Sequence, residues 1–154
     1  MIKHEMTPDQ YKARIEELLQ YNKTSPLGSI ARLVEIDLID FDLEKKKTHF
    51  RHIVNGNDIN RIHSVHGGFL TAIGDTCMSF SAGPLLQEDK VITTIDMHIN
   101  TFRPFFLNDV MDVYCEILHL GKRTVHAQAK LFKDDELCTV VTQNYAVIPS
   151  QKVT

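Results

Sequence analysis

The fold of this chain is decided by residues 66–82, which read HGGFLTAIGDTCMSFSA. The stretch begins with His66 and two glycines, a combination that suits a tight turn or close approach of a ligand to the backbone. An apolar run of small side chains follows, and Asp75 is the carboxylate within it. Because burying an unpaired charge is costly, such a residue usually has a partner or a task. We therefore predict a buried central helix that carries the chemistry, with strands wrapped around it.

Length and composition predict one domain over residues 1–154, because a chain with 43% hydrophobic and 24% charged residues can bury a core. The net charge of −3 does not suggest the basic surface that a nucleic-acid-binding protein usually has. The first residues lack the apolar segment of a secretory signal, and no run is long enough to span a membrane. Three isolated cysteines lie in apolar segments: Cys77, Cys115 and Cys138. We expect reduced core thiols in a cytoplasmic protein with no cofactor, nucleic-acid partner or membrane partner.

Periodicity predicts an α+β order of elements. The segment Thr7-Pro8-Asp9-Gln10 has the pattern of a capped helix start, so a first helix is expected over about residues 8–22. Alternation predicts strands over residues 30–41, 47–54, 91–102, 110–120, 124–132 and 137–148. Residues 55–65 have no usable period and are expected to form a loop that leads to the central helix. One very apolar helix with antiparallel strands on both sides favours a sheet that curls round the helix.

The order of these elements, together with several motifs, resembles the hotdog-fold PaaI-like acyl-CoA thioesterases. Asn60 stands six residues before His66-Gly67-Gly68, and Asp75 stands nine residues after His66. Three later stretches also fit that family: Thr94-Ile95-Asp96-Met97, Thr101-Phe102-Arg103-Pro104 and Leu120-Gly121-Lys122-Arg123-Thr124. The resemblance covers about residues 28–148. It implies an antiparallel sheet wrapped around a long central helix, and hydrolysis of an acyl-CoA thioester to a free acid and CoA.

The resemblance also implies roles for particular residues. The Gly67 amide would help to hold the carbonyl oxygen of the thioester, and Asn60 would contact the substrate or a water at the same place. Asp75 would either attack the carbonyl carbon or activate a water, and the sequence leaves that choice open. Thr94 would orient the water. Ser79, one helical turn after Asp75, would be a further supporting hydroxyl.

Elementary physical chemistry supports the same site. Thioester hydrolysis develops negative charge on the carbonyl oxygen, and a free backbone N–H at a helix N-terminus is a ready donor to it. Gly67 or Gly68 lets the substrate approach that amide with no Cβ in the way. Gly67 and Asp75 are eight residues apart, which is about 12 Å along a helix and too far for both to touch one thioester. The site should therefore combine Gly67 of one subunit with Asp75 of another, in an obligate homodimer or a dimer of dimers.

Five other side chains have less decided roles. His66 is expected to fix the loop through a hydrogen bond and so to aim the amide that follows it. The family usually keeps a glycine where this chain has His63, and a histidine there predicts ordinary backbone geometry. Arg103, Lys122 and Arg123 would meet the phosphates of the CoA nucleotide, or else they are turn charges in water. No metal is expected, and a non-catalytic acyl-CoA sensor is the alternative function; aryl, short and medium acyl groups are all open.

Overall fold

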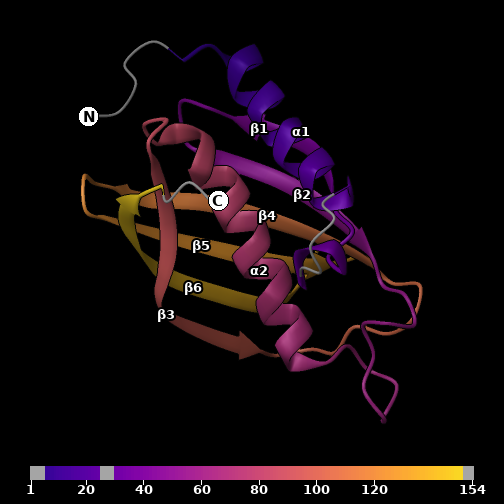
Figure 1. Cartoon of the computed structure of the whole chain (residues 1–154). Coiled ribbons are helices and arrows are strands. Elements are labelled where there is room, and N and C mark those ends of the chain that lie inside the picture. Colours follow the sequence, from indigo (N-terminus) through magenta and orange to yellow (C-terminus); the bar gives the residue numbers. More distant parts are fainter. Residues whose placement is uncertain (1–5, 25–29, 151–154) are drawn as a thin grey trace.

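Six strands form one antiparallel sheet in front of which a long helix lies (Figure 1). The computed structural model describes residues 6–24 and 30–150. The helices are α1 (Pro8–Thr24) and α2 (Gly67–Ala82), with the short 3-10 helices η1 (Ile30–Arg32) and η2 (Gly83–Leu85). The strands are β1 (Asp37–Asp42), β2 (Lys47–Ile53), β3 (Lys90–Thr101), β4 (Val110–Leu120), β5 (Thr124–Lys133) and β6 (Glu136–Pro149). Their order across the sheet is β1-β2-β4-β5-β6-β3.

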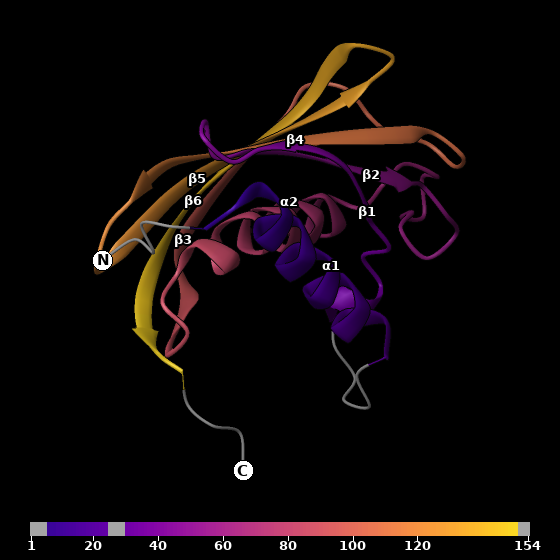
Figure 2. The same ribbon diagram turned by 90° about the horizontal axis from the view of Figure 1, so that it is seen from above.

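The sheet curls so that α2 lies on its concave side, with α1 beside α2 on the same side (Figure 2). Alternation along the central strands explains this, because every second residue of β5 points to the helix and is fully buried. These inward residues are Val125, Ala127, Ala129 and Leu131. The predicted α+β arrangement, an antiparallel sheet wrapped around a long central helix with an N-terminal helix, is confirmed.

The start of α1 is fixed by the predicted capping box. The Thr7 amide donates to Gln10 Oε1 at 2.9 Å, and the Gln10 amide donates to Thr7 Oγ1 at 3.2 Å. Tyr11 and Ile15 on the inner face of α1 are fully buried. The Tyr11 hydroxyl donates to the Ser81 carbonyl at 2.8 Å, which docks α1 on the end of α2. Burial raises the pKa of this phenol well above its ordinary value, so it stays a donor.

The middle of α2 lies very close to β6. A Cβ added to Gly74 would meet Val141 Cγ2 at 2.8 Å, closer than real Cβ atoms approach another atom. Only glycine therefore lets the helix backbone come this near to the strand. The consequence for function is that Asp75, the next residue, is brought within reach of side chains from β6.

One predicted strand is largely wrong. Alternation over residues 30–41 predicts a single strand, but residues 30–32 form η1 and the strand begins only at Asp37. The preceding Glu35 carbonyl accepts a hydrogen bond from the His52 imidazole at 2.6 Å, so a side chain takes the place of a strand partner. Val34 and Ile36 are buried without belonging to the sheet. The expected start of the core near residue 28 lies outside the described residues.

Strand β3 is an edge of the sheet. Among the described strands its only partner is β6, through a register that shifts between Thr94 and Asp96. Along it Val91, Ile95 and Ile99 are 41%, 55% and 37% exposed. A long edge strand with exposed apolar residues is a ready surface for pairing with another strand.

The three cysteines are free and buried, as predicted for core thiols. Burial and the neighbouring Cys115 raise the pKa of the Cys77 thiol well above its ordinary value. Among the helices of the described residues, none is both long and apolar enough to cross a membrane.

Candidate active site

The N-terminus of α2 presents an unpaired backbone amide. His66 is its N-cap, and His66 Nδ1 accepts a hydrogen bond from the Gly68 amide at 2.9 Å. His66 thus makes the hydrogen bond to the loop that was expected of it, and its role in aiming the next amide stays a prediction. In the described part of the chain the Gly67 amide has no hydrogen-bond partner, as the first N–H groups of a helix have none within it. A Cβ on Gly67 would meet nothing within 4 Å, so a ligand can reach this amide at the positive end of the helix dipole.

Asn60 organises the loop that leads to this amide. Its Oδ1 accepts hydrogen bonds from the amides of Ile62 at 3.0 Å and Ser64 at 3.3 Å. Its Nδ2 donates to Ser64 Oγ at 3.2 Å. The expectation of ordinary geometry at His63 is wrong, because its φ is 65°, in the left-handed region. The His63 amide donates to the Asn60 carbonyl at 3.0 Å, and this closed turn holds a residue type that enters the left-handed region more readily than most.

A buried histidine–aspartate pair lies beneath the loop. His52 Nε2 lies 2.8 Å from Asp58 Oδ2, and both side chains are fully buried. The other ring nitrogen, Nδ1, donates to the Glu35 carbonyl at 2.6 Å, since a carbonyl oxygen can only accept. Both ring nitrogens of His52 are thus hydrogen-bonded, one to the Glu35 carbonyl and one to the Asp58 carboxyl group. The Asp58 carbonyl accepts from the His66 amide at 2.8 Å, so the pair supports the N-cap of α2.

Sequence reasoning missed this pair. The available signal was the inward position of His52 on β2, in alternation with Thr48 and Phe50, where an apolar residue would be expected. Asp58 gave no comparable signal, because it lies in a loop without a period.

Asp75 lies half-buried in the middle of α2, and its partners come from β6. Gln143 Nε2 donates to Asp75 Oδ1 at 2.6 Å, and the Tyr145 hydroxyl lies 3.3 Å from the same oxygen. Burial, then the charge of Asp75, raise the pKa of Tyr145 well above its ordinary value, so this phenol remains a donor. Asp75 Oδ2 has no hydrogen-bond partner among the described residues. The expectation that Asp75 has a partner is confirmed, although neither partner was predicted.

The same glutamine connects Asp75 to Thr94. Gln143 Nε2 donates to Thr94 Oγ1 at 2.7 Å, so the helix carboxylate and the hydroxyl on β3 meet through β6. Ser79 lies one turn further along α2 and donates its hydroxyl to the Thr76 carbonyl at 3.0 Å. Of the predicted site residues, the structure thus brings together Asp75 and Thr94 at one place and Asn60, His66, Gly67 and Gly68 at another.

Gly67 and Asp75 belong to the same helix and are eight positions apart. Their separation along the axis is about 12 Å at 1.5 Å per residue. Within one chain, a single thioester carbonyl cannot touch both the free amide and the free carboxylate oxygen.

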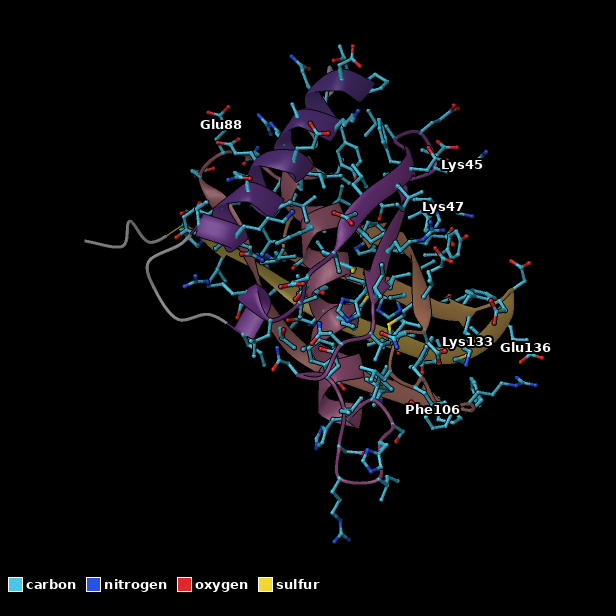
Figure 3. All side chains as sticks on the ribbon, turned by 90° about the vertical axis from the view of Figure 1, so that its right-hand side faces the viewer. Lys45, Lys47, Glu88, Phe106, Lys133 and Glu136 are labelled. Atoms are coloured by element: carbon cyan, nitrogen blue, oxygen red, sulfur yellow. The ribbon has the colours of Figure 1, made fainter. Side chains whose placement is uncertain are left out.

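The three predicted phosphate-binding cations do not gather in one chain. The Arg103 amide donates to the Cys138 carbonyl, whereas the Arg123 carbonyl accepts from the Val147 amide. These two β6 residues are nine positions apart, or about 30 Å at 3.3 Å per residue. Arg103 pairs with Glu136 at 3.2 Å, at the end of the sheet where Figure 3 labels Glu136, Lys133 and Phe106. Lys122 and Arg123 are exposed at the opposite end.

Comparison with protein families gives one match, the thioesterase superfamily, over residues 63–140. The match covers half of the chain and includes Asp75, Thr94 and the glycines after His66. The chain belongs to the thioesterase superfamily. Membership supports thioester hydrolysis as the general activity. Among curated proteins, no match is found.

Several solved structures share the fold of this superfamily member. The PaaI protein from the phenylacetic acid degradation operon of E. coli is 17% identical, with a TM-score of 0.76 over 93% of this chain and 96% of that one. A thioesterase from Haemophilus influenzae is 19% identical, with a TM-score of 0.77 over 99% of both chains. Zebrafish thioesterase superfamily member 2 is 14% identical, with a TM-score of 0.76 over 86% of this chain and 94% of that one. These likenesses confirm the predicted hotdog fold.

Proposed function

We propose that this protein is an acyl-CoA thioesterase that hydrolyses its substrate to a free acid and CoA. The observation that carries the proposal is that two groups on α2, the Gly67 amide and Asp75 Oδ2, have no hydrogen-bond partner among the described residues. The amide donates to the carbonyl oxygen as negative charge develops there. Asp75 takes a proton from an attacking water, or attacks the carbonyl carbon itself. When Asp75 acts as base, the C–S bond then breaks and the CoA sulfur receives the proton that Asp75 took from the water. When Asp75 attacks, CoA leaves as the thiolate, and a water then hydrolyses the anhydride to the free acid and regenerates the carboxylate.

The supporting residues have roles that follow from their places. Thr94 lies beside Asp75 and orients the attacking water. Asn60 shapes the loop before Gly67 and contacts the substrate or a water there. Ser79, one turn beyond Asp75, is a further hydroxyl near the substrate.

The active enzyme is a homodimer in which Gly67 of one copy and Asp75 of the other serve the same thioester. The separation of these two residues in one chain supports this arrangement. The unpaired edge of β3 and its exposed apolar residues provide a surface for a second copy. A second copy also supplies the missing cations, since Arg103 and the pair Lys122 and Arg123 lie at opposite ends of one sheet. Two such dimers can pair again as a tetramer. The cytoplasmic location inferred from the isolated cysteines stays a prediction.

The decisive experiment measures thiol release from a panel of aryl, short and medium acyl-CoAs, with wild type and Asp75→Asn side by side. We expect wild type to release CoA, and the variant to lose at least about 100-fold in kcat, the scale for a positioned acid or base. Asp89→Asn is the matched control, because that carboxylate is exposed and its ion pair among the described residues is with the neighbouring Lys90. If a folded Asp75→Ala enzyme releases thiol at the wild-type rate, the proposed mechanism is wrong.

Two further outcomes separate the alternatives. Saturable acyl-CoA binding without thiol release from any substrate favours the non-catalytic sensor. If release occurs, single-turnover hydrolysis in heavy-oxygen water separates the two roles of Asp75. Label found in the Asp75 carboxylate indicates a covalent anhydride, because water that attacks the anhydride at the Asp75 carbonyl carbon leaves its oxygen there.

A further inference from the structure

Gln143 occupies a position where packing alone would favour an apolar residue. It lies on the inward face of β6, in alternation with Val141 and Tyr145, and is fully buried. Its side-chain oxygen, Oε1, has no hydrogen-bond partner among the described residues. A buried amide with an unused acceptor is less favourable than a methionine or leucine of similar size. Stability therefore does not explain this glutamine.

The hydrogen bonds of Gln143 have only one consistent direction. Its amide nitrogen carries two hydrogens, and Nε2 contacts two oxygens, Asp75 Oδ1 at 2.6 Å and Thr94 Oγ1 at 2.7 Å. With the amide turned over, Oε1 would face a carboxylate oxygen with no hydrogen between them. Gln143 therefore donates to both groups, and both oxygens accept.

We propose that Gln143 is a positioning residue that assigns the two oxygens of Asp75 to different tasks; this rests on the proposed thioesterase function. Oδ1 is occupied by Gln143 and lies beside the Tyr145 hydroxyl, so Oδ2 is the oxygen that acts as base or nucleophile. Thr94 Oγ1 accepts from Gln143, so the hydroxyl proton of Thr94 points elsewhere. It is then free to donate to the attacking water, which in turn gives its own proton to Oδ2.

The test replaces Gln143 with methionine, which fills a similar volume and has no donor. We expect kcat to fall by roughly 10- to 100-fold, the scale for supporting partners of a reactive group, with little change in KM. The acid limb of the pH–rate profile should move to higher pH, because the carboxylate has lost a donor that favours its charged form. Gln128→Met is the matched control, since Gln128 lies on the neighbouring strand β5 and faces the opposite side of the sheet.

A second variant keeps the test sharp if methionine disturbs folding. Gln143→Glu preserves shape and places a like charge beside Asp75, which should move the acid limb further in the same direction. If wild type releases thiol, Asp75→Asn does not, and both folded Gln143 variants keep the wild-type kcat and pH profile, this positioning role is overturned while the proposed function stands. If wild type releases no thiol, the proposed function itself fails.

Discussion

The two ends of the candidate site are held in different ways. At the N-terminus of α2, the free amide of Gly67 is set by its own neighbourhood, because His66, Asn60 and Asp58 all lie within nine residues of it. In the middle of α2, Asp75 is held by residues 68 and 70 positions later in the chain. The first region is exposed at the amide and is held mostly by residues close to it in sequence, with the buried His52–Asp58 pair beneath it. The second exists only once β6 has packed against the helix.

This difference assigns a distinct task to each region. An oxyanion donor has to be open to the substrate, and among the described residues the Gly67 amide has no hydrogen-bond partner, while a Cβ on Gly67 would meet nothing within 4 Å. A catalytic carboxylate has to keep one oxygen fixed and one free, which requires donors from a second element. Substitutions in the loop should therefore disturb the donor, and substitutions at the helix–strand contact should disturb the carboxylate.

The largest expected effect is on the loop, through its buried support. Asp58→Ala removes one partner of the fully buried pair with His52 and leaves an imidazole nitrogen unpaired. We expect a loss of about 3–5 kcal/mol in the free energy of unfolding, measured by urea denaturation. Its carbonyl still accepts from His66, so at temperatures where the variant is folded Asp75 should keep its role.

The same strand offers the control. His49 also lies on β2 and pairs with Asp112 at 2.7 Å, but on the opposite, partly exposed face of the sheet. Asp112 also accepts from Arg51 Nε at 3.0 Å, and because these groups keep some contact with water, Asp112→Ala should cost about 1 kcal/mol, well below the loss in Asp58→Ala. If both variants lose the same free energy of unfolding, burial does not make the His52–Asp58 pair more stabilising than the His49–Asp112 pair.

One added methyl group at Gly74 should disturb the contact between α2 and β6. Gly74→Ala places a Cβ 2.8 Å from Val141, so α2 has to move away from β6. We expect a loss of about 1–3 kcal/mol in unfolding free energy, together with lower kcat because the Gln143–Asp75 contact lengthens. Both are measured on one preparation, by urea denaturation and thiol release. Wild-type values of both would show that the helix and strand adapt without cost.

Much of this fold could be predicted because its signals are local. The capping box at Thr7 and Gln10, the apolar helix and the alternating strands each follow from residues close in sequence. The strand expected over residues 30–41 failed for the opposite reason. Its alternation is real, but whether a segment pairs depends on its neighbour, and there the His52 side chain takes the Glu35 carbonyl.

The site residues also divide into those with a local sequence signal, which could be predicted, and those defined by distant contacts, which could not. Asp75, Gly67 and His66 stand in one short stretch and could be recognised together. Gln143 stands in an ordinary strand pattern, and no sequence periodicity connects it to a helix 68 residues earlier. The sequence also could not predict that Arg103 lies at the opposite end of the sheet from Lys122 and Arg123, because this depends on where each turn meets β6.

The smallest expected effect comes from a substitution that should disturb the loop before α2 and leave the Asp75 carboxylate unchanged. His66→Ala removes the acceptor for the Gly68 amide, a lost N-cap that should cost about 1 kcal/mol of unfolding free energy. The turn that aims the Gly67 amide loosens, so kcat should fall. The acid limb of the pH–rate profile should stay in place, because Gln143 and Tyr145 still hold Asp75.

His66→Asn is the matched variant, because asparagine is among the best N-cap residues. It should recover the lost stability and part of the lost kcat. A shift of the acid limb in His66→Ala would contradict the separation of the two regions, since it would mean that the N-terminus of α2 also controls the carboxylate in its middle. An unchanged profile with lowered kcat would instead assign oxyanion stabilisation to the loop and proton transfer to the helix–strand contact.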